Sequence, residues 1–147
     1  RHSARSYDEV IPDSRYPATL RHSERYPDDY AALERVSGKG VPVVSVLFSG
    51  RPVYANDLIN MSDAFIAAWL PGTEGQGITD ILFRGANGRM AKDFQGRLPF
   101  DWPGASCPEN AKKPVLFARG YGLKLAKKSN LGRLPEDGVE TCPPLAE

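Results

Sequence analysis

The fold class of this 147-residue chain is indicated most clearly by the stretch Ala67-Ala68-Trp69-Leu70-Pro71-Gly72-Thr73-Glu74-Gly75-Gln76-Gly77. An apolar run stops at Pro-Gly, passes through a glycine-rich turn, and gives way to helical periodicity from Ile78 onward. This order predicts a strand, a tight turn and a helix from Thr73 to about residue 83, with a capping box between Thr73 and Gln76. Because open α/β sheets place ligands at such strand-to-helix turns, the turn is a candidate functional site.

Two further elements precede this turn. Val41 to Phe48 is almost entirely β-branched or aromatic, which is typical of a parallel strand buried on both faces, and Ala64 to Leu70 is a second such strand. Upstream, Pro27-Asp28-Asp29 predicts the start of a helix, since proline suits the first turn and carboxylates favour the positive end of the helix dipole. This helix should end at Gly38 or Gly40. Its expected inner face is Tyr30, Leu33 and Val36.

The rest of the chain contains fewer clear elements. Arg84 to Lys92 is glycine-rich and basic, which predicts a surface loop, and Gln95 to Trp102 predicts a short edge strand interrupted by Pro99. Two central strands are few for a sheet of about four to six, so the chain should be the second half of a larger domain. We expect a loop leader at 1–25, the partial domain at 26–125, and a polar, proline-rich tail or linker at 126–147.

Composition excludes several classes of function. Apolar residues make up 41% and charged residues 25%, as in an ordinary globular domain. The net charge of +1 argues against nucleic acid or an anionic membrane as partner. No apolar run reaches the roughly 20 residues of a membrane span, and no signal peptide is recognisable. The two cysteines, Cys107 and Cys142, either form one disulfide or remain two free thiols.

Three motif blocks carry a family resemblance: Ser49-Gly50-Arg51-Pro52, the Ala67–Gly77 stretch, and Asp93-Phe94-Gln95-Gly96-Arg97-Leu98-Pro99. In this order they resemble the C-terminal α/β-sandwich domain of glycoside hydrolase family 3, the β-glucosidases and exo-β-glucanases. Leu116 to Leu123 is similar to the end of that domain in the bacterial exo-β-glucanase type. The resemblance implies an α/β layered sandwich with a mostly parallel sheet and flanking helices.

The resemblance also implies where the catalytic carboxylates lie. Retaining glycosidases use one carboxylate as nucleophile and another as acid/base. In this family the nucleophilic aspartate lies on an N-terminal (β/α)8 barrel, and in many exo-glucanases a loop with the pattern Pro-Tyr-x-Glu-x-x-Gly-Asp supplies the acid/base. Residues Ser6 to Asp13 match its Tyr, Glu and last Asp, and depart from it at Ser6 and Pro12. Glu9 is thus the candidate general acid/base; the alternative is a solvated carboxylate in a flexible leader.

Other residues invite a functional interpretation but favour a structural one. Glu74 suits the first turn of a helix, where a carboxylate stabilises the dipole. Arg51 suits an ion pair within the fold, Trp69 a core position, and Trp102 the edge of the domain. His2 and His22 lie in polar surroundings without partners for a nucleophile–base dyad, which predicts surface positions. The glycine-rich turn lacks the lysine and the glycine spacing of a phosphate-binding loop.

The implied function is part of a retaining, exo-acting β-glucosidase or β-glucan glucohydrolase that releases terminal β-D-glucosyl residues. Its implied partners are the β-glucan or β-glucoside substrate and the barrel of the same enzyme, with no cofactor or metal, in the periplasm or secreted. The chain alone should be inactive, because it supplies at most one of the two carboxylates. The alternative is a non-catalytic orphan sandwich domain that acts as a binding or interaction module, or a small α/β domain that binds another small molecule.

Overall fold

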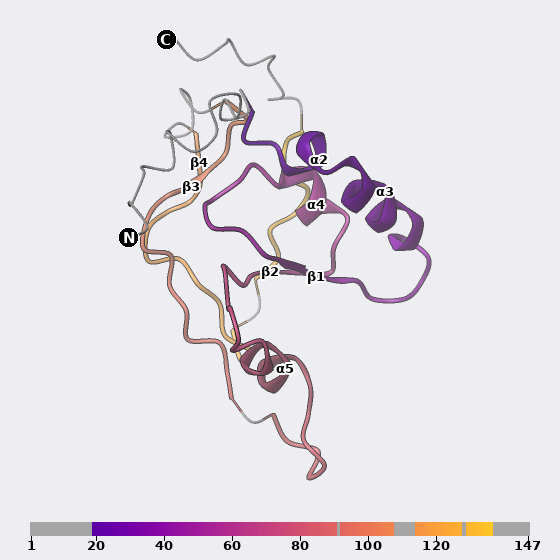
Figure 1. Ribbon diagram of the computed structural model, residues 1–147, viewed down its shortest axis with the longest axis vertical. Helices are drawn as coiled ribbons and strands as arrows, with labels where there is room; N and C mark the ends of the chain where they lie inside the picture. Colours follow the sequence, from indigo (N-terminus) through magenta and orange to yellow (C-terminus); the bar gives the residue numbers. More distant parts are fainter. Residues whose placement is uncertain (1–18, 91, 108–113, 128, 137–147) are drawn as a thin grey trace, which may run out of the picture.

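The computed structural model describes residues 19–90, 92–107, 114–127 and 129–136. Its elements in chain order are α2 (His22–Arg25), α3 (Pro27–Val36), β1 (Val44–Leu47), α4 (Asn56–Asn60), β2 (Ala64–Ala67), α5 (Gln76–Leu82), β3 (Trp102–Pro103) and β4 (Val115–Phe117). Strands β1 and β2 pair in parallel, and β3 and β4 pair antiparallel. Figure 1 shows α3 and α4 on one side of the β1–β2 sheet and α5 on the other. The predicted layered α/β fold with a parallel sheet is confirmed.

Helix α3 forms as its sequence predicts. Pro27 occupies the first helical position, and Asp28 and Asp29 lie in the first turn. The helix ends where the Ser37 N–H donates to the Leu33 carbonyl, just before Gly38 takes a φ of 69°. Tyr30 and Leu33 pack against the core. Val36, expected on the inner face, is instead 50% exposed, because the helix end extends beyond the elements that cover its first turns.

The core lies around a β1–α4–β2 unit. Val44 is paired with Ala64 and Leu47 with Ala67, and the short helix α4 makes the connection between the two strands. The buried apolar cluster consists of Leu47, Val53, Ala55, Leu58, Ile59 and Trp102. Helix α4 was not predicted, because a five-residue helix is too short to show helical periodicity.

The predicted strand Ala64–Leu70 ends early, at Ala67. Trp69 has a φ of 56°, a left-handed conformation that an extended strand cannot continue through. The predicted capping box is also wrong, because α5 begins at Gln76 and Gly75 is its N-cap without a side-chain bond. The Gln76 amide donates instead to Thr79 Oγ1, at 2.9 Å, and to Asp80 Oδ1, at 3.1 Å.

The predicted strand Gln95–Trp102 is largely wrong. Only Trp102 and Pro103 form a strand, β3, and Trp102 pairs with Phe117 of β4. Leu98 exchanges backbone hydrogen bonds with a distant turn: its N–H donates to the Tyr121 carbonyl at 2.9 Å, and its carbonyl accepts from Gly120 at 2.8 Å. The leader also ends differently from expectation, because His22–Arg25 is helical rather than loop.

The β1–β2 sheet leaves apolar surface uncovered. We expected β1 to be buried on both faces, but only Leu47 is buried, whereas Val44 is 51% and the following Phe48 55% exposed. Leu70, beyond the end of β2, is 71% exposed. Helix α5 buries none of its residues, so it does not close this side of the sheet. A two-stranded sheet with such exposure lacks the neighbours that a stable α/β sheet needs.

We therefore expect the isolated chain to be marginally stable and to associate through the open β1–β2 sheet. Unpaired strand edges and uncovered apolar patches template aggregation. Thermal unfolding recorded together with light scattering should show a broad, irreversible transition that depends on protein concentration. A sharp, reversible transition in a monomer would contradict this expectation.

Candidate functional site

The first candidate site is the edge at which the two parallel strands end. Ser49 Oγ donates to the Arg51 carbonyl at 2.7 Å, which fixes the turn that follows β1. Gly50 lies against the turn that follows β2, because a Cβ atom at Gly50 would come within 3.2 Å of Leu70 Cδ1. The Ser-Gly-Arg-Pro block and the Ala67–Gly77 stretch therefore meet in space at the carboxyl edge of the sheet.

Glu74 lies in this edge but has no feature of a catalytic carboxylate. It is exposed and belongs to the turn before α5, where its N–H donates to the Pro71 carbonyl at 2.9 Å. Its predicted place in the first helical turn is wrong, because the helix starts two residues later. Its carboxylate accepts no hydrogen bond within the described ranges. A carboxylate with neither burial nor a partner is an ordinary surface group.

Trp69, which precedes the glycine-rich turn, belongs to an aromatic cluster with Phe100 and Trp102. The Trp69 ring meets the edge of Phe100 at 5.4 Å and the Trp102 ring at 5.8 Å between centroids. Trp69 packs against the core, as predicted. Trp102 is only 3% exposed and belongs to the core, so the prediction of an edge position is wrong. Because Trp102 is inaccessible, it cannot serve as a platform for a sugar ring.

A buried carboxylate joins the end of the leader to α4. Asp57 is 2% exposed, and its Oδ2 accepts from Arg21 Nε at 3.1 Å and from Ser23 Oγ at 2.5 Å. Its Oδ1 accepts from the Leu58 N–H at 2.9 Å. Asp57 is not among the site residues that the sequence predicts. The sequence contained a signal, since a carboxylate inside the mostly apolar run Val53–Ile59 must be paired if it is buried.

Backbone hydrogen bonds strengthen this junction. The Leu20 N–H donates to the Ser106 carbonyl at 2.5 Å, and the Leu20 carbonyl accepts from Tyr54 at 2.9 Å. The His22 N–H donates to the Tyr54 carbonyl at 3.2 Å. Residues 20–23 are therefore fixed between α4 and the loop that follows β3. Glu9, the candidate acid/base, lies outside the described residues.

The segment 134–136 is held on the polar face of α4. Asn60 forms a reciprocal pair with Leu134, donating to its carbonyl at 2.9 Å and accepting from its N–H at 2.8 Å. The Asn56 amide and the Tyr54 hydroxyl both donate to the Pro135 carbonyl, at 2.9 and 3.2 Å. The same short helix thus contacts both the end of the leader and residues 134–136 of the predicted tail.

Among the residues that the structure describes, the remaining candidates form no catalytic dyad or metal centre. His22 Nε2 lies 3.0 Å from Asp29 Oδ2. The His22 side chain is only 11% exposed, so its predicted surface position is wrong. His2 lies outside the described residues. Cys107 is 1% exposed and disulfide-bonded, and Cys142 lies outside the described residues. Over the described ranges, no group of three or more potential metal ligands occurs, and no helix is long and apolar enough to span a membrane.

The comparisons with known proteins agree with the paired strand-end motifs. Residues 15–125 match the family model of the glycosyl hydrolase family 3 C-terminal domain. The chain belongs to this family. The family 3 match includes all three motif blocks, the β1–α4–β2 unit and the antiparallel β3–β4 pair.

Relatives of this family 3 chain include β-glucosidases and an exo-glucanase. It is 31% identical over 125 residues to the lysosomal beta glucosidase of Dictyostelium discoideum and 34% identical over 116 residues to the periplasmic beta-glucosidase of Salmonella typhimurium. These alignments cover 77% and 74% of this chain but only 14% of each relative. The crystal structure of the exo-1,3/1,4-beta-glucanase from a Pseudoalteromonas species is also similar, with a TM-score of 0.73 and 38% sequence identity. This match covers 80% of the present chain and 15% of the glucanase chain.

Proposed function

We propose that this chain is the sandwich part of a retaining, exo-acting β-glucosidase or β-glucan glucohydrolase. Such an enzyme releases terminal β-D-glucosyl residues from β-glucans or β-glucosides. In this proposal a family 3 barrel supplies the nucleophile and the sandwich part supplies the acid/base, Glu9. The observation that carries the proposal is the family 3 match over residues 15–125, with β-glucosidases and an exo-β-glucanase as relatives.

The division of labour follows from the chemistry of retention. The acid/base protonates the leaving oxygen and then activates water, while the nucleophile forms the covalent glycosyl intermediate. The buried Asp57 carboxylate accepts hydrogen bonds from Arg21 and Ser23, and the Glu74 carboxylate is exposed to solvent. In this proposal the nucleophile therefore comes from a second domain, the family 3 barrel.

We also propose an oxidising compartment for this protein, the periplasm or the exterior of the cell. The buried disulfide at Cys107 supports this, since structural disulfides persist where thiols are not kept reduced. The relatives named as periplasmic and lysosomal enzymes agree with such a location.

The experiment that tests the proposed reaction uses a fusion of this chain to the barrel of the Salmonella relative. NMR spectroscopy of a β-glucan oligomer during hydrolysis should show β-glucose as the first product, released from the non-reducing end. Mutarotation then converts it to the anomeric mixture. Release of α-glucose first would contradict retention, and release of oligomers from inside the chain would contradict the exo-acting mode.

A further inference from the structure

The charges of this chain are unevenly distributed along its sequence. The net charge of the whole is only +1, but residues 84–128 carry ten Lys or Arg against three Asp or Glu. The remainder carries nine basic and fifteen acidic residues. The near-neutral total therefore conceals a strongly basic part, for which the whole-chain argument against anionic partners does not hold.

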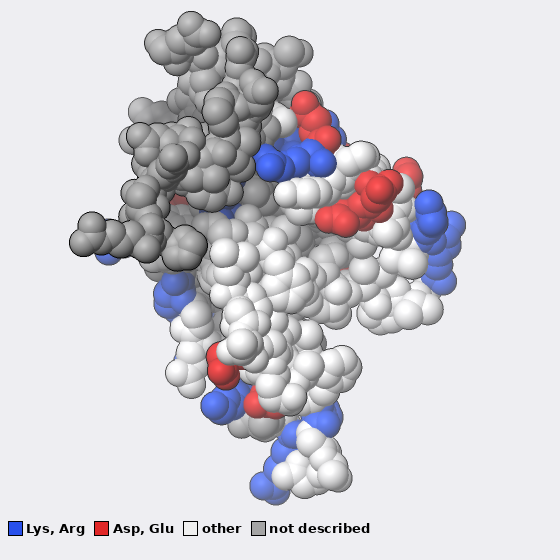
Figure 2. Space-filling model, in the orientation of Figure 1, with Lys and Arg blue, Asp and Glu red and all other residues white. Residues whose placement is uncertain are grey.

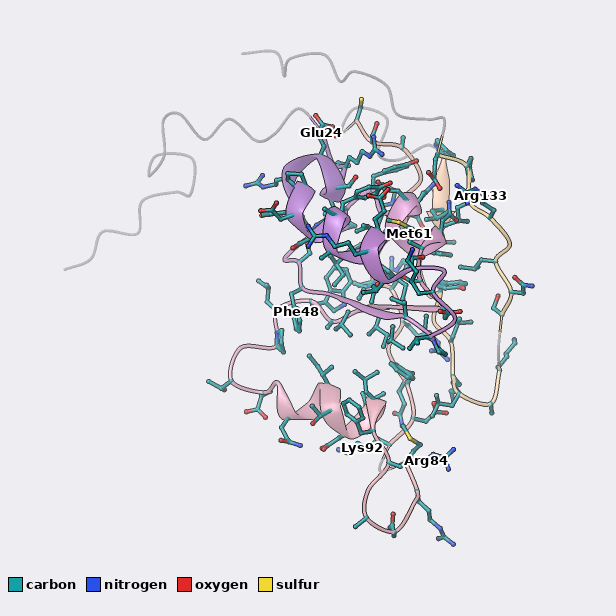
Figure 3. All side chains as sticks on the ribbon, turned by 90° about the vertical axis from the view of Figure 1, so that its right-hand side faces the viewer. Glu24, Phe48, Met61, Arg84, Lys92 and Arg133 are labelled. Carbon is teal, nitrogen blue, oxygen red and sulfur yellow. The ribbon has the colours of Figure 1, made fainter. Side chains whose placement is uncertain are left out.

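Two of these basic residues, Arg84 and Arg89, lie on a protruding hairpin. The chain turns back on itself through a bridge between Arg84 and Met90, closed by hydrogen bonds from the Gly85 N–H to the Arg89 carbonyl at 2.9 Å and from the Gly88 N–H to the Gly85 carbonyl at 2.8 Å. Figure 1 shows this hairpin at the far end of the molecule, beyond α5. Figure 3 shows Arg84 and Lys92 near its base.

A second basic turn lies beside the hairpin. Asp93 Oδ1 accepts the Leu125 N–H at 2.9 Å, which places the turn Lys124–Lys127 next to Lys92. Gly122 lies so close to the Gly96 carbonyl and the Arg97 side chain that a Cβ atom there would not fit. We call the resulting surface the basic arm; its six exposed cations are Arg84, Arg89, Lys92, Arg97, Lys124 and Lys127.

The cations of the basic arm form no ion pair within the described part of the chain. The three ion pairs found there join Arg21 to Asp57, His22 to Asp29, and Arg133 to Glu136. The nearest carboxylate in the sequence, that of Asp93, already accepts the N–H groups of Phe94 and Leu125. Figure 2 shows Lys and Arg side chains at the protruding lower end of the molecule. Such a set of clustered cations without carboxylate partners attracts a polyanion.

Exposed apolar side chains alternate with these cations. Phe83, directly before Arg84, is 67% exposed, and Leu125, between Lys124 and Lys127, is 45% exposed. A pyranose ring has an apolar face that packs on an aromatic ring, and its carboxylate substituent is a strong partner for arginine. The basic arm consists of a hairpin and a turn, so it lacks the continuous apolar face of an amphipathic helix that lies in a membrane surface.

From this surface we infer that the basic arm binds an acidic polysaccharide, a linear chain of pyranose rings that carry carboxylates. The choice of a glycan as the polyanion rests on the proposed function, but the binding itself requires no hydrolysis. Binding would hold the protein on a carboxylated glycan matrix. The two proposals can therefore fail independently. Polysaccharide binding is measured as a Kd, whereas the glucosidase reaction is measured as turnover.

The test measures binding of the chain to fluorescently labelled polygalacturonate at low and at physiological ionic strength. The expected result is binding that weakens steeply with salt and is lost when the polymer is methyl-esterified, because screening and removal of the carboxylates both remove the attraction. The triple variant Arg84→Gln/Arg89→Gln/Lys92→Gln should weaken binding at least about tenfold, since each cation near an anionic surface contributes appreciably. Phe83→Ala should weaken binding by about fivefold through loss of the ring contact.

The matched control neutralises three exposed cations elsewhere, in the variant Arg25→Gln/Arg35→Gln/Lys39→Gln. This control should bind the polymer within about twofold of the original chain, because the neutralised groups lie on and after α2 and α3, away from the basic arm. Equal loss in both triple variants, equal binding of the methyl-esterified polymer, or no binding at low salt would overturn the proposal. Tighter binding to phosphatidylglycerol vesicles or to an oligonucleotide than to polygalacturonate would overturn the assignment of a glycan partner.

Discussion

Glu9→Gln, in a protein that joins this chain to a family 3 barrel, is expected to slow hydrolysis of β-glucosides with poor leaving groups by about 10²–10⁴-fold. This is the usual contribution of general acid/base catalysis. Gln cannot donate the proton that a poor leaving group needs. Activated aryl glucosides need little protonation, so their first step should be far less affected. Azide should restore turnover in the second step, because it needs no general base.

The matched control for this measurement is Glu74→Gln, which removes the same charge from an exposed turn of the same chain. It should leave turnover of both substrate classes unchanged and shift stability by less than about 0.5 kcal/mol. The assignment of the acid/base to Glu9 fails if Glu9→Gln behaves like this control with a natural β-glucan oligomer. It also fails if azide restores nothing in a variant that is slow with activated substrates.

Asp57→Ala is expected to unfold the chain. The substitution leaves Arg21 without its carboxylate partner, Ser23 without its acceptor, and a cavity beside α4. Breaking a buried ion pair of this kind costs about 3 kcal/mol or more. A chain with an uncovered sheet has little stability in reserve. Circular dichroism during urea titration at low protein concentration should show no cooperative transition for this variant.

Two variants control for this expectation. Asp57→Asn retains an oxygen acceptor of the same shape, so it should keep a cooperative transition, with a urea midpoint below that of the original chain. Asp29→Asn removes the partner of His22, but Asp29 is 65% exposed, so the change should cost less than about 1 kcal/mol. An unchanged urea midpoint for Asp57→Ala would show that this network does not stabilise the fold.

The parts of the fold that the sequence predicted are those with strong local signals. Pro27-Asp28-Asp29 marked α3 because helix starts depend on local backbone chemistry. The β-branched runs predicted β1 and β2, because apolar strands differ from their surroundings by composition alone. The strand-end motifs predicted the family through their order along the chain.

The failures share a physical cause, which is dependence on contacts between distant residues. Leu98 pairs with the 118–121 turn rather than with a neighbouring strand, so local alternation misplaced that segment. Trp102 is buried because it pairs with Phe117, a partner that the spacing does not reveal. The buried Asp57 depends on Arg21 and Ser23, more than thirty residues away.

The central claim is that this chain supplies one half of a two-carboxylate active site. The direct test is turnover of an aryl β-glucoside by the purified chain alone and by the same chain fused to the barrel of the Salmonella relative. We expect no turnover above buffer for the chain alone and clear turnover for the fusion, because two carboxylates on opposite sides of the bond are required. Turnover by the chain alone at the rate of a full-length β-glucosidase would contradict this claim.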